Sequence, residues 1–216
     1  MKSISLADQV FERLENDIVT GVFPRGEVLT ELGLSERLDV SRTPIREALH
    51  RLEQEHLVQT SGKGMVVMGI TREDLEDIMD IRLHVEGIAA RYAALHLDEN
   101  GRAKLTNLME LQDFYTERKD YDHLRQLDDE LHETIYELSG RLVLMDVLRP
   151  LHLKALRYRR QSIAQRSVRS TAEHKAICKA ILAGEAEKAE SLMTQHIQNA
   201  KTNMIKGLKD HGTDNR

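Results

Sequence analysis

Apolar residues recur at helical spacing along most of the chain, and the first such run lies near the N-terminus. Its apolar positions are four residues apart: Leu6, Val10, Leu14 and Ile18. Ser5 and Asp8 form a capping-box pattern before the run and Gly21 follows it, so a first helix is predicted over 5–20. A second, shorter helix is predicted over 30–38.

The ten residues VSRTPIREAL, at 40–49, begin a third helix with two contrasting faces. One face is apolar and contains Ile45, Ala48, Leu49 and Leu52. The opposite face contains Arg42, Thr43, Arg46 and His50. Thr43 is expected to cap the helix, and Pro44 lies in its first turn, where a missing N–H costs nothing. Arginines near the N-terminal end of an exposed helix suit the major groove, where Arg holds guanine O6 and N7, so this face is predicted to read DNA.

Two short strand-like runs follow, at 57–60 and 65–68. Ser61-Gly62-Lys63-Gly64 joins them as a tight hairpin with a basic tip, which makes Lys63 and Gly64 candidate DNA contacts. Three helices and a hairpin predict a winged helix-turn-helix over residues 1–69. The alternative is a small helical domain whose arginines are merely solvated. The capping residue, the two contrasting faces of the third helix and the basic hairpin all favour DNA binding instead.

Beyond residue 69 the apolar spacing is helical only. Thr71 and Asp74 form another capping-box pattern. Helices are predicted at 71–95, 98–119, 122–139, 143–165, 170–183 and 185–208. Pro150 is expected to kink or restart the fourth of these. Residues 70–216 are therefore predicted to form an all-α helical bundle, and the whole chain is predicted to be mostly α.

Several ionisable side chains lie on the apolar faces of these bundle helices, where they need a partner or a ligand. Four of them can meet: Asp128, His132, His174 and His196. Asp128 and His132 are one turn apart, whereas His174 and His196 flank the turn at 183–185 at similar heights. Three imidazoles and a carboxylate suit a divalent transition metal, with Zn²⁺ or Ni²⁺ as the favoured ions.

These residues also have a simpler interpretation. A histidine on an apolar face is usually a hydrogen-bonded core residue, and Asp128 with His132 would then be a local pair. Arg82 and Glu86, on the apolar face of their helix, would be a structural ion pair at i, i+4. Three further histidines are interpreted as solvated or structural: His84, His123 and His152.

Composition narrows the class of protein. The 216 residues include no Trp and only 4% aromatic residues, and their net charge is −5, which excludes a general nucleic-acid coat and base-stacking single-strand binding. DNA affinity must come from a local basic patch: Arg37, Arg42, Arg46, Arg51 and Lys63. With Cys178 as the one cysteine and no apolar run of membrane-spanning length, a cytoplasmic protein is expected, without membrane association.

The 40–49 run resembles the GntR superfamily of bacterial regulators. Other parts are similar to its FadR-type branch with an FCD ligand-binding domain: Arg82 with Glu86, LDDELH at 127–132, Glu173-His174 and MTQHI at 193–197. The resemblance implies a dimeric, metabolite-responsive transcription factor. It also implies a metal held by the Asp128, His132, His174 and His196 set, and a small carboxylate effector that completes the metal's coordination near Arg82.

The same resemblance implies DNA contacts from Arg42, Arg46 and the hairpin around Lys63 and Gly64. The chain departs from the pattern at Leu32-Gly33, where many relatives carry a polar or basic residue, and Gly33 weakens that helix. We therefore expect a homodimer on pseudo-palindromic double-stranded operator DNA, with repression relieved by the effector.

Two other functions are considered. The first is a metal-dependent hydrolase or lyase with a DNA-binding appendage, but the chain has no HExxH arrangement and no nucleophile motif. The second is a purely structural metal, or none, in a bundle that only dimerises. Arg82 on the inner face argues against it, because a closed structural site needs no further cation.

Overall fold

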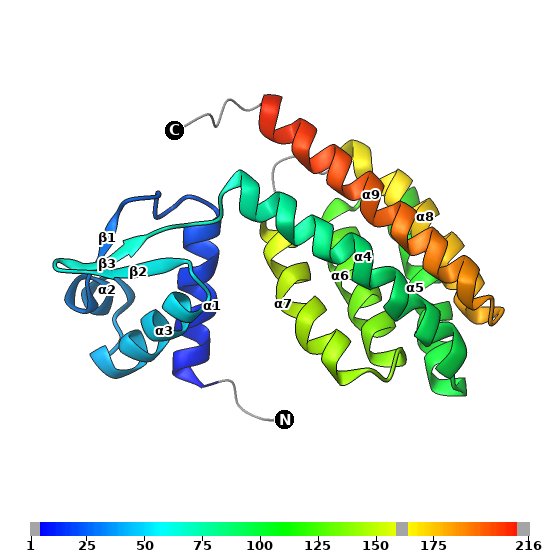
Figure 1. Cartoon of the computed structure of the whole chain (residues 1–216), viewed down its shortest axis with the longest axis horizontal. Helices are drawn as coiled ribbons and strands as arrows, with labels where there is room; N and C mark the ends of the chain where they lie inside the picture. The colour runs from blue at the N-terminus through cyan, green and yellow to red at the C-terminus, as the bar shows by residue number, and fades with distance from the viewer. Residues whose placement is uncertain (1–4, 159–163, 211–216) are drawn as a thin grey trace. The chain divides into compact units, whose positions relative to one another are not determined.

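The computed structural model describes residues 5–158 and 164–210. The chain divides into two compact units, Met1–Asp74 and Leu75–Arg216 (Figure 1). The elements of the first unit are α1 (Leu6–Val19), β1 (Val28–Leu29), α2 (Glu31–Leu38), α3 (Arg42–Gln54), β2 (Val58–Ser61) and β3 (Gly64–Val67). Three helices and a hairpin thus form the predicted winged helix-turn-helix.

The helix ends of the first unit follow the sequence signals, with one correction. The Ser5–Asp8 capping box is present at α1, and Thr30 caps α2. The N-cap of α3 is Ser41, not Thr43, and its side chain makes no capping hydrogen bond. The reason is that Asp39 ends α2 in the left-handed region at φ 53°, so that only two residues separate it from the first residue of α3.

A strand that the sequence did not predict completes the sheet. β1 is two residues long and pairs antiparallel with β3, which gives the strand order β1-β3-β2. Gly64 is required at this junction, because a Cβ on it would lie 2.6 Å from the carbonyl oxygen of Leu29. The sheet packs on the apolar faces of the three helices, where Ile45, Leu49 and Leu52 are buried.

In its described residues the second unit is entirely helical. Its elements are α4 (Arg72–His96), α5 (Glu99–Glu117), α6 (Tyr121–Leu138), α7 (Leu142–Tyr158), α8 (Ala164–Leu182) and α9 (Ala186–Asp210). The predicted helix at 143–165 corresponds to α7, which ends at Tyr158, and α8 begins six residues before its expected start at 170. Pro150 lies inside α7, which continues beyond it. None of the described helices has the length and apolar character needed to cross a membrane.

α4 lies close to α9 at Gly87, and its inner face carries polar groups into the core of this bundle. Gly87 makes the approach possible, because a Cβ there would lie 2.5 Å from Oγ1 of Thr194. The inner face of α4 then carries Arg82 and Glu86 into the interior, where both are fully buried. An arginine and a glutamate without solvent must find partners in the protein.

Candidate functional site

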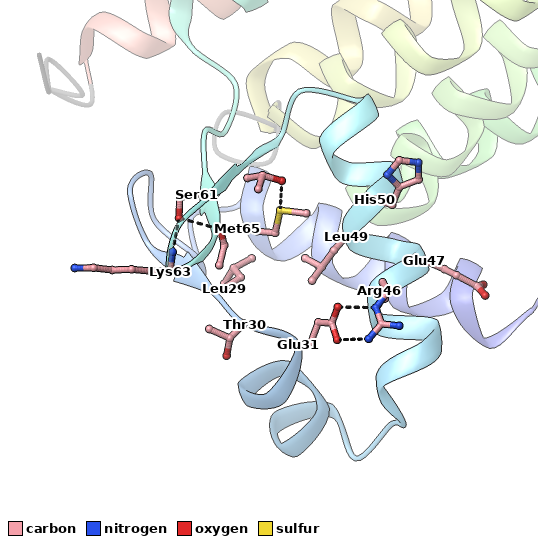
Figure 2. Close-up of a pocket in the computed structure, with 12 residues that line it drawn as sticks. Leu29, Thr30, Glu31, Arg46, Glu47, Leu49, His50, Ser61, Lys63 and Met65 are labelled. Atoms are coloured by element: carbon pink, nitrogen blue, oxygen red, sulfur yellow. Dashed lines mark hydrogen bonds and ion pairs between the residues drawn. The ribbon is translucent and has the colours of Figure 1, made fainter.

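A groove of about 650 Å³ runs between α3, the start of α2 and the hairpin of the first unit (Figure 2). Of the six predicted DNA-contacting residues, four line it: Arg46, His50, Lys63 and Gly64. Arg42 and Thr43 lie outside this lining but are exposed at the first turn of the same helix. The structure therefore gathers four of the six predicted residues around one open groove, and the other two are exposed at the start of α3.

Three arginines of the predicted basic patch already have partners. Arg37 stacks over Phe23, and Arg51 bonds Asp8 while lying over Phe11. Arg46 donates from Nε and Nη2 to the two carboxylate oxygens of Glu31, at 2.7 and 2.8 Å. This bidentate contact lowers the pKa of the Glu31 carboxyl and raises that of the Arg46 guanidinium.

The second unit brings three of the four predicted metal ligands together in its core. One ligand atom each from His132 (α6), His174 (α8) and His196 (α9) lies within 4.8 Å of the others, and all three residues are buried. The Nε2 atoms of His174 and His196 are 3.3 Å apart. Asp128 lies at the edge of this histidine cluster, with Oδ1 at 3.4 Å from Nε2 of His174.

Each imidazole of the histidine cluster is held at its outer nitrogen by another side chain. Nδ1 of His132 is 2.7 Å from Glu86, and Nδ1 of His196 is 2.8 Å from Glu173. Nδ1 of His174 is 3.1 Å from the amide of Gln112. Polar partners behind each ring fix its orientation, as they do for histidines that bind metals.

An unsatisfied nitrogen tests whether these residues fit a metal ion. Nε2 of His132 is buried and has no hydrogen-bond partner among the described residues, although buried polar atoms are nearly always satisfied. The Nε2 atoms of His174 and His196 face each other at hydrogen-bond distance. At most one of these two nitrogens can therefore carry a proton. Three imidazole nitrogens that converge in this way fit a divalent ion, which would replace the proton between His174 and His196.

Arg82 and Glu86 form the i, i+4 ion pair that was one interpretation of the sequence. Nε of Arg82 is 2.5 Å from Oε1 of Glu86, and the same carboxylate contacts His132 through Oε2. Burial alone would raise the pKa of Glu86, but the charge of Arg82 and the hydrogen bond with His132 hold it well below its usual range. Glu86 thus connects the predicted effector arginine to the histidine cluster.

His152 was interpreted as solvated or structural, and the structure places it beside Arg82. Nη2 of Arg82 is 3.0 Å from Nδ1 of His152, and burial lowers the pKa of His152 to about 4. Its Nε2 is 3.1 Å from Asp129 without the alignment of a hydrogen bond. Glu86, His132 and His152 also lie close enough together to hold a metal ion. In this second cluster, however, the guanidinium of Arg82 is the cation, because it contacts both Glu86 and His152.

Tyr136 is another residue that sequence reasoning missed. It is buried, its hydroxyl has no hydrogen-bond partner in the part of the chain that the structure describes, and its ring lies next to those of His132 and His152. Burial and the nearby Glu86 raise the pKa of Tyr136 well above its usual value, so the hydroxyl keeps its proton. An unused donor beside Arg82 suits an anionic ligand.

The two units match two different family descriptions. Residues 6–67 match "Bacterial regulatory proteins, gntR family", and residues 77–199 match "FCD domain". The chain is 30% identical over 205 residues to BphR of Paraburkholderia xenovorans (strain LB400), described as an HTH-type transcriptional regulator, with 91% of this chain and 84% of that protein covered.

Two further comparisons agree with these matches. The HTH-type transcriptional repressor RspR of Escherichia coli (strain K12) is 29% identical over 193 residues, which cover 88% of this chain and 85% of that protein. The solved structure of E. coli McbR/YncC superposes with a TM-score of 0.76 at 22% identity, over 95% of this chain and 99% of that one. The second likeness is one of fold.

Proposed function

Because the chain belongs to the GntR family of bacterial transcriptional regulators and carries an FCD domain, we propose that it is a repressor controlled by a small carboxylate. Both domains and the similar proteins are those of regulators rather than enzymes. The alternative of a hydrolase or lyase is therefore set aside. Similarity to a named repressor supports the sign of control.

In this proposal the groove of the first unit binds operator DNA. Arg46 and His50 face the bases from α3, with Arg42 and Thr43 one turn earlier, while Lys63 and Gly64 of the hairpin approach the backbone. The groove supports the assignment because it gathers exposed donors from two elements on one surface. One recognition helix covers few base pairs, so two copies are needed for a pseudo-palindromic site.

The dimer is supported by an apolar stripe on α4. Ile81, Ile88 and Leu95 are spaced by seven residues, and 44%, 37% and 57% of their surfaces are exposed. Residues at this spacing lie on one side of a helix and suit packing against a second copy. Ile88→Lys should therefore yield monomers in analytical ultracentrifugation, whereas a variant that remained dimeric would move the interface elsewhere.

The proposed effector site lies in the second unit. His132, His174 and His196, with Asp128 at their edge, would hold Zn²⁺ or Ni²⁺, which supplies a positive charge and Lewis acidity for a carboxylate oxygen. The observation that supports this assignment is that the two nitrogens of each imidazole have different roles. The outer nitrogens are held by Glu86, Gln112 and Glu173, while the inner ones converge.

Arg82 would provide the second anchor for the effector. Its Nε is committed to Glu86, but its Nη2 is bonded to His152, which is neutral and therefore the weaker of the two partners. A carboxylate makes a stronger, charge-assisted bond to a guanidinium and can replace an imidazole there. Displacement of His152 would alter the position of α7, which is how ligand binding would reach the rest of the bundle.

The test combines elemental analysis with DNA titration. Purified protein should hold about one transition-metal ion per chain, and His174→Ala should hold far less. A duplex selected from random sequence by the wild-type protein serves as the operator, and a panel of small carboxylates is screened for release. His174→Ala should still bind the duplex but ignore the carboxylate that releases wild type. Full response of metal-free protein would contradict the proposed mechanism.

A further inference from the structure

Among the described residues, Glu31 is the one acidic residue of the groove that is hydrogen-bonded to a predicted base-reading residue, Arg46. It is the first residue of α2, directly after the N-cap Thr30, so the helix and not a loop fixes its position. Its carboxylate lies at the positive end of that helix, where a negative charge is favoured. Leu34 of the same helix is buried in the core, which anchors α2 against α3.

The geometry of the contact decides which donors of Arg46 remain available. A guanidinium has five N–H groups, and Glu31 engages one edge only, through Nε and Nη2. The remaining edge presents Nη1 and the second hydrogen of Nη2 side by side. Two parallel N–H groups at that edge are what guanine O6 and N7 accept. Glu31 therefore leaves free the edge of Arg46 that reads a base.

We propose that Glu31 is a specificity-determining residue, which positions the guanidinium of Arg46 side-on so that its free edge meets a guanine. The proposal rests on the proposed role of Arg46 as a base reader. Arg46 is long, and 66% of its side chain is exposed, so without a partner it would adopt many rotamers that serve phosphates as well as bases. The carboxylate selects one of these and also repels phosphates that approach without a matching base.

A rival role for the same contact is masking. Glu31 would then compete with DNA for Arg46 and release it on binding, and the ion pair would only weaken affinity. The two roles differ in base preference. A positioning residue changes the preference at the base pair that Arg46 reads, whereas a mask changes affinity for all duplexes equally.

The experiment uses the full chain and a duplex that it selects from random sequence. Binding of that duplex, of each single-base-pair variant and of a scrambled duplex is measured by fluorescence anisotropy at one salt concentration, because affinities depend on salt. Arg46→Ala identifies the base pair that Arg46 reads. Glu31→Gln then tests the proposal, since the amide keeps the size of the side chain but loses its charge and one of its acceptors.

Glu47→Gln is the matched control. Glu47 also lines the groove, but its side chain extends away from the Glu31–Arg46 pair (Figure 2), so it undergoes the same change of charge without touching Arg46. Glu31→Gln should reduce preference at the Arg46 base pair by roughly 10-fold while raising affinity for scrambled DNA. Glu47→Gln should raise affinity for scrambled DNA and leave the preference intact.

Each other outcome counts against the proposal. If Glu31→Gln tightens binding to every duplex and keeps the preference, the contact is a mask. If Arg46→Ala leaves all base preferences unchanged, the placement of the recognition helix fails and the role of Glu31 fails with it. Equal melting temperatures of the first unit in both glutamine variants would show that the change in preference is not a loss of fold.

Discussion

Each unit of the molecule contains an arginine paired with a glutamate through Nε, and the two pairs differ in their surroundings. The Arg46–Glu31 pair is in a groove, with 66% and 34% of its side chains exposed. The Arg82–Glu86 pair is in the bundle core, at 1% and 0%. The same pair of residue types is thus exposed to solvent in the first unit and buried in the second.

Because they differ in exposure, the two ion pairs have different roles. An exposed ion pair contributes little to folding and is weakened by salt, so the task of the Arg46–Glu31 pair is to hold the guanidinium with one edge open to solvent. A buried pair cannot lose one member cheaply, because the remaining charge would lie in the interior without compensation. Arg82 and Glu86 are therefore a fixed frame on which His132 and His152 are oriented, and only the outer donors of Arg82 are open to exchange.

The largest expected effect comes from breaking the buried pair. Arg82→Met keeps the length of the side chain but leaves Glu86 without its cation, and should lower the free energy of unfolding by about 3–5 kcal/mol. Arg46→Met, the exposed counterpart, should leave the melting temperature unchanged. Urea or thermal denaturation of both variants measures the contrast directly.

A double variant checks the cause of that loss. Arg82→Met with Glu86→Leu removes both charges and should regain part of the stability, since no unpaired carboxylate remains. If the single variant Arg82→Met instead melted like wild type, the buried pair would not be a structural frame. Arg82 would then be free to serve the effector with all its donors.

Metal removal is the next largest effect and should distinguish the two units. The four candidate ligands come from α6, α8 and α9, so a shared ion links these helices and binds only the folded bundle. Dialysis against a chelator should lower the stability of the second unit by about 3–4 kcal/mol, if zinc had been 100- to 1,000-fold above its Kd. The first unit should keep its stability and its affinity for DNA. Equal destabilisation of both units would contradict separate roles.

Much of the fold was predictable because local signals are strong. Apolar spacing and capping boxes predicted the helices of both units, and the two faces of α3 predicted the exposed arginines. β1 was missed because two residues are too short to show alternation. The start of α8 was placed six residues too late, at 170 instead of Ala164, because apolar spacing determines the ends of a helix less well than its presence.

The candidate site was predictable only where residues share a helix or a turn. Asp128 and His132 are one turn apart, and the helical hairpin at 183–185 relates His174 to His196. The partners behind the rings come from distant helices: Glu86 is 46 residues from His132, and Gln112 is 62 from His174. No spacing within one element reports such contacts, and His152, 70 residues from Arg82, was missed for the same reason.

A smaller effect separates the two carboxylates behind the histidine cluster. Glu86→Gln and Glu173→Gln each replace an acceptor of an imidazole N–H, and each should lower the affinity for Zn²⁺ by roughly 10- to 100-fold. Only Glu86→Gln should also destabilise the metal-free protein, because Glu86 holds Arg82 while Glu173 is partly exposed. Calorimetric zinc titration and melting of the metal-free variants measure both quantities. Equal melting would remove Glu86 from the structural frame.

The smallest effect concerns the tip of the hairpin. Lys63 is exposed in the two-residue loop between β2 and β3, and its flexible ammonium suits a phosphate better than a base edge. Lys63→Ala should weaken binding a few-fold on the selected and scrambled duplexes alike, and should reduce the slope of log affinity against log salt by about 1. Anisotropy titrations at several salt concentrations measure this slope. Arg46→Ala, in contrast, should alter base preference, because its guanidinium is oriented by a carboxylate while the lysine is not required to hold one direction. A change of base preference in Lys63→Ala would show that the hairpin reads sequence, and the contrast between an oriented arginine and a mobile lysine would no longer hold.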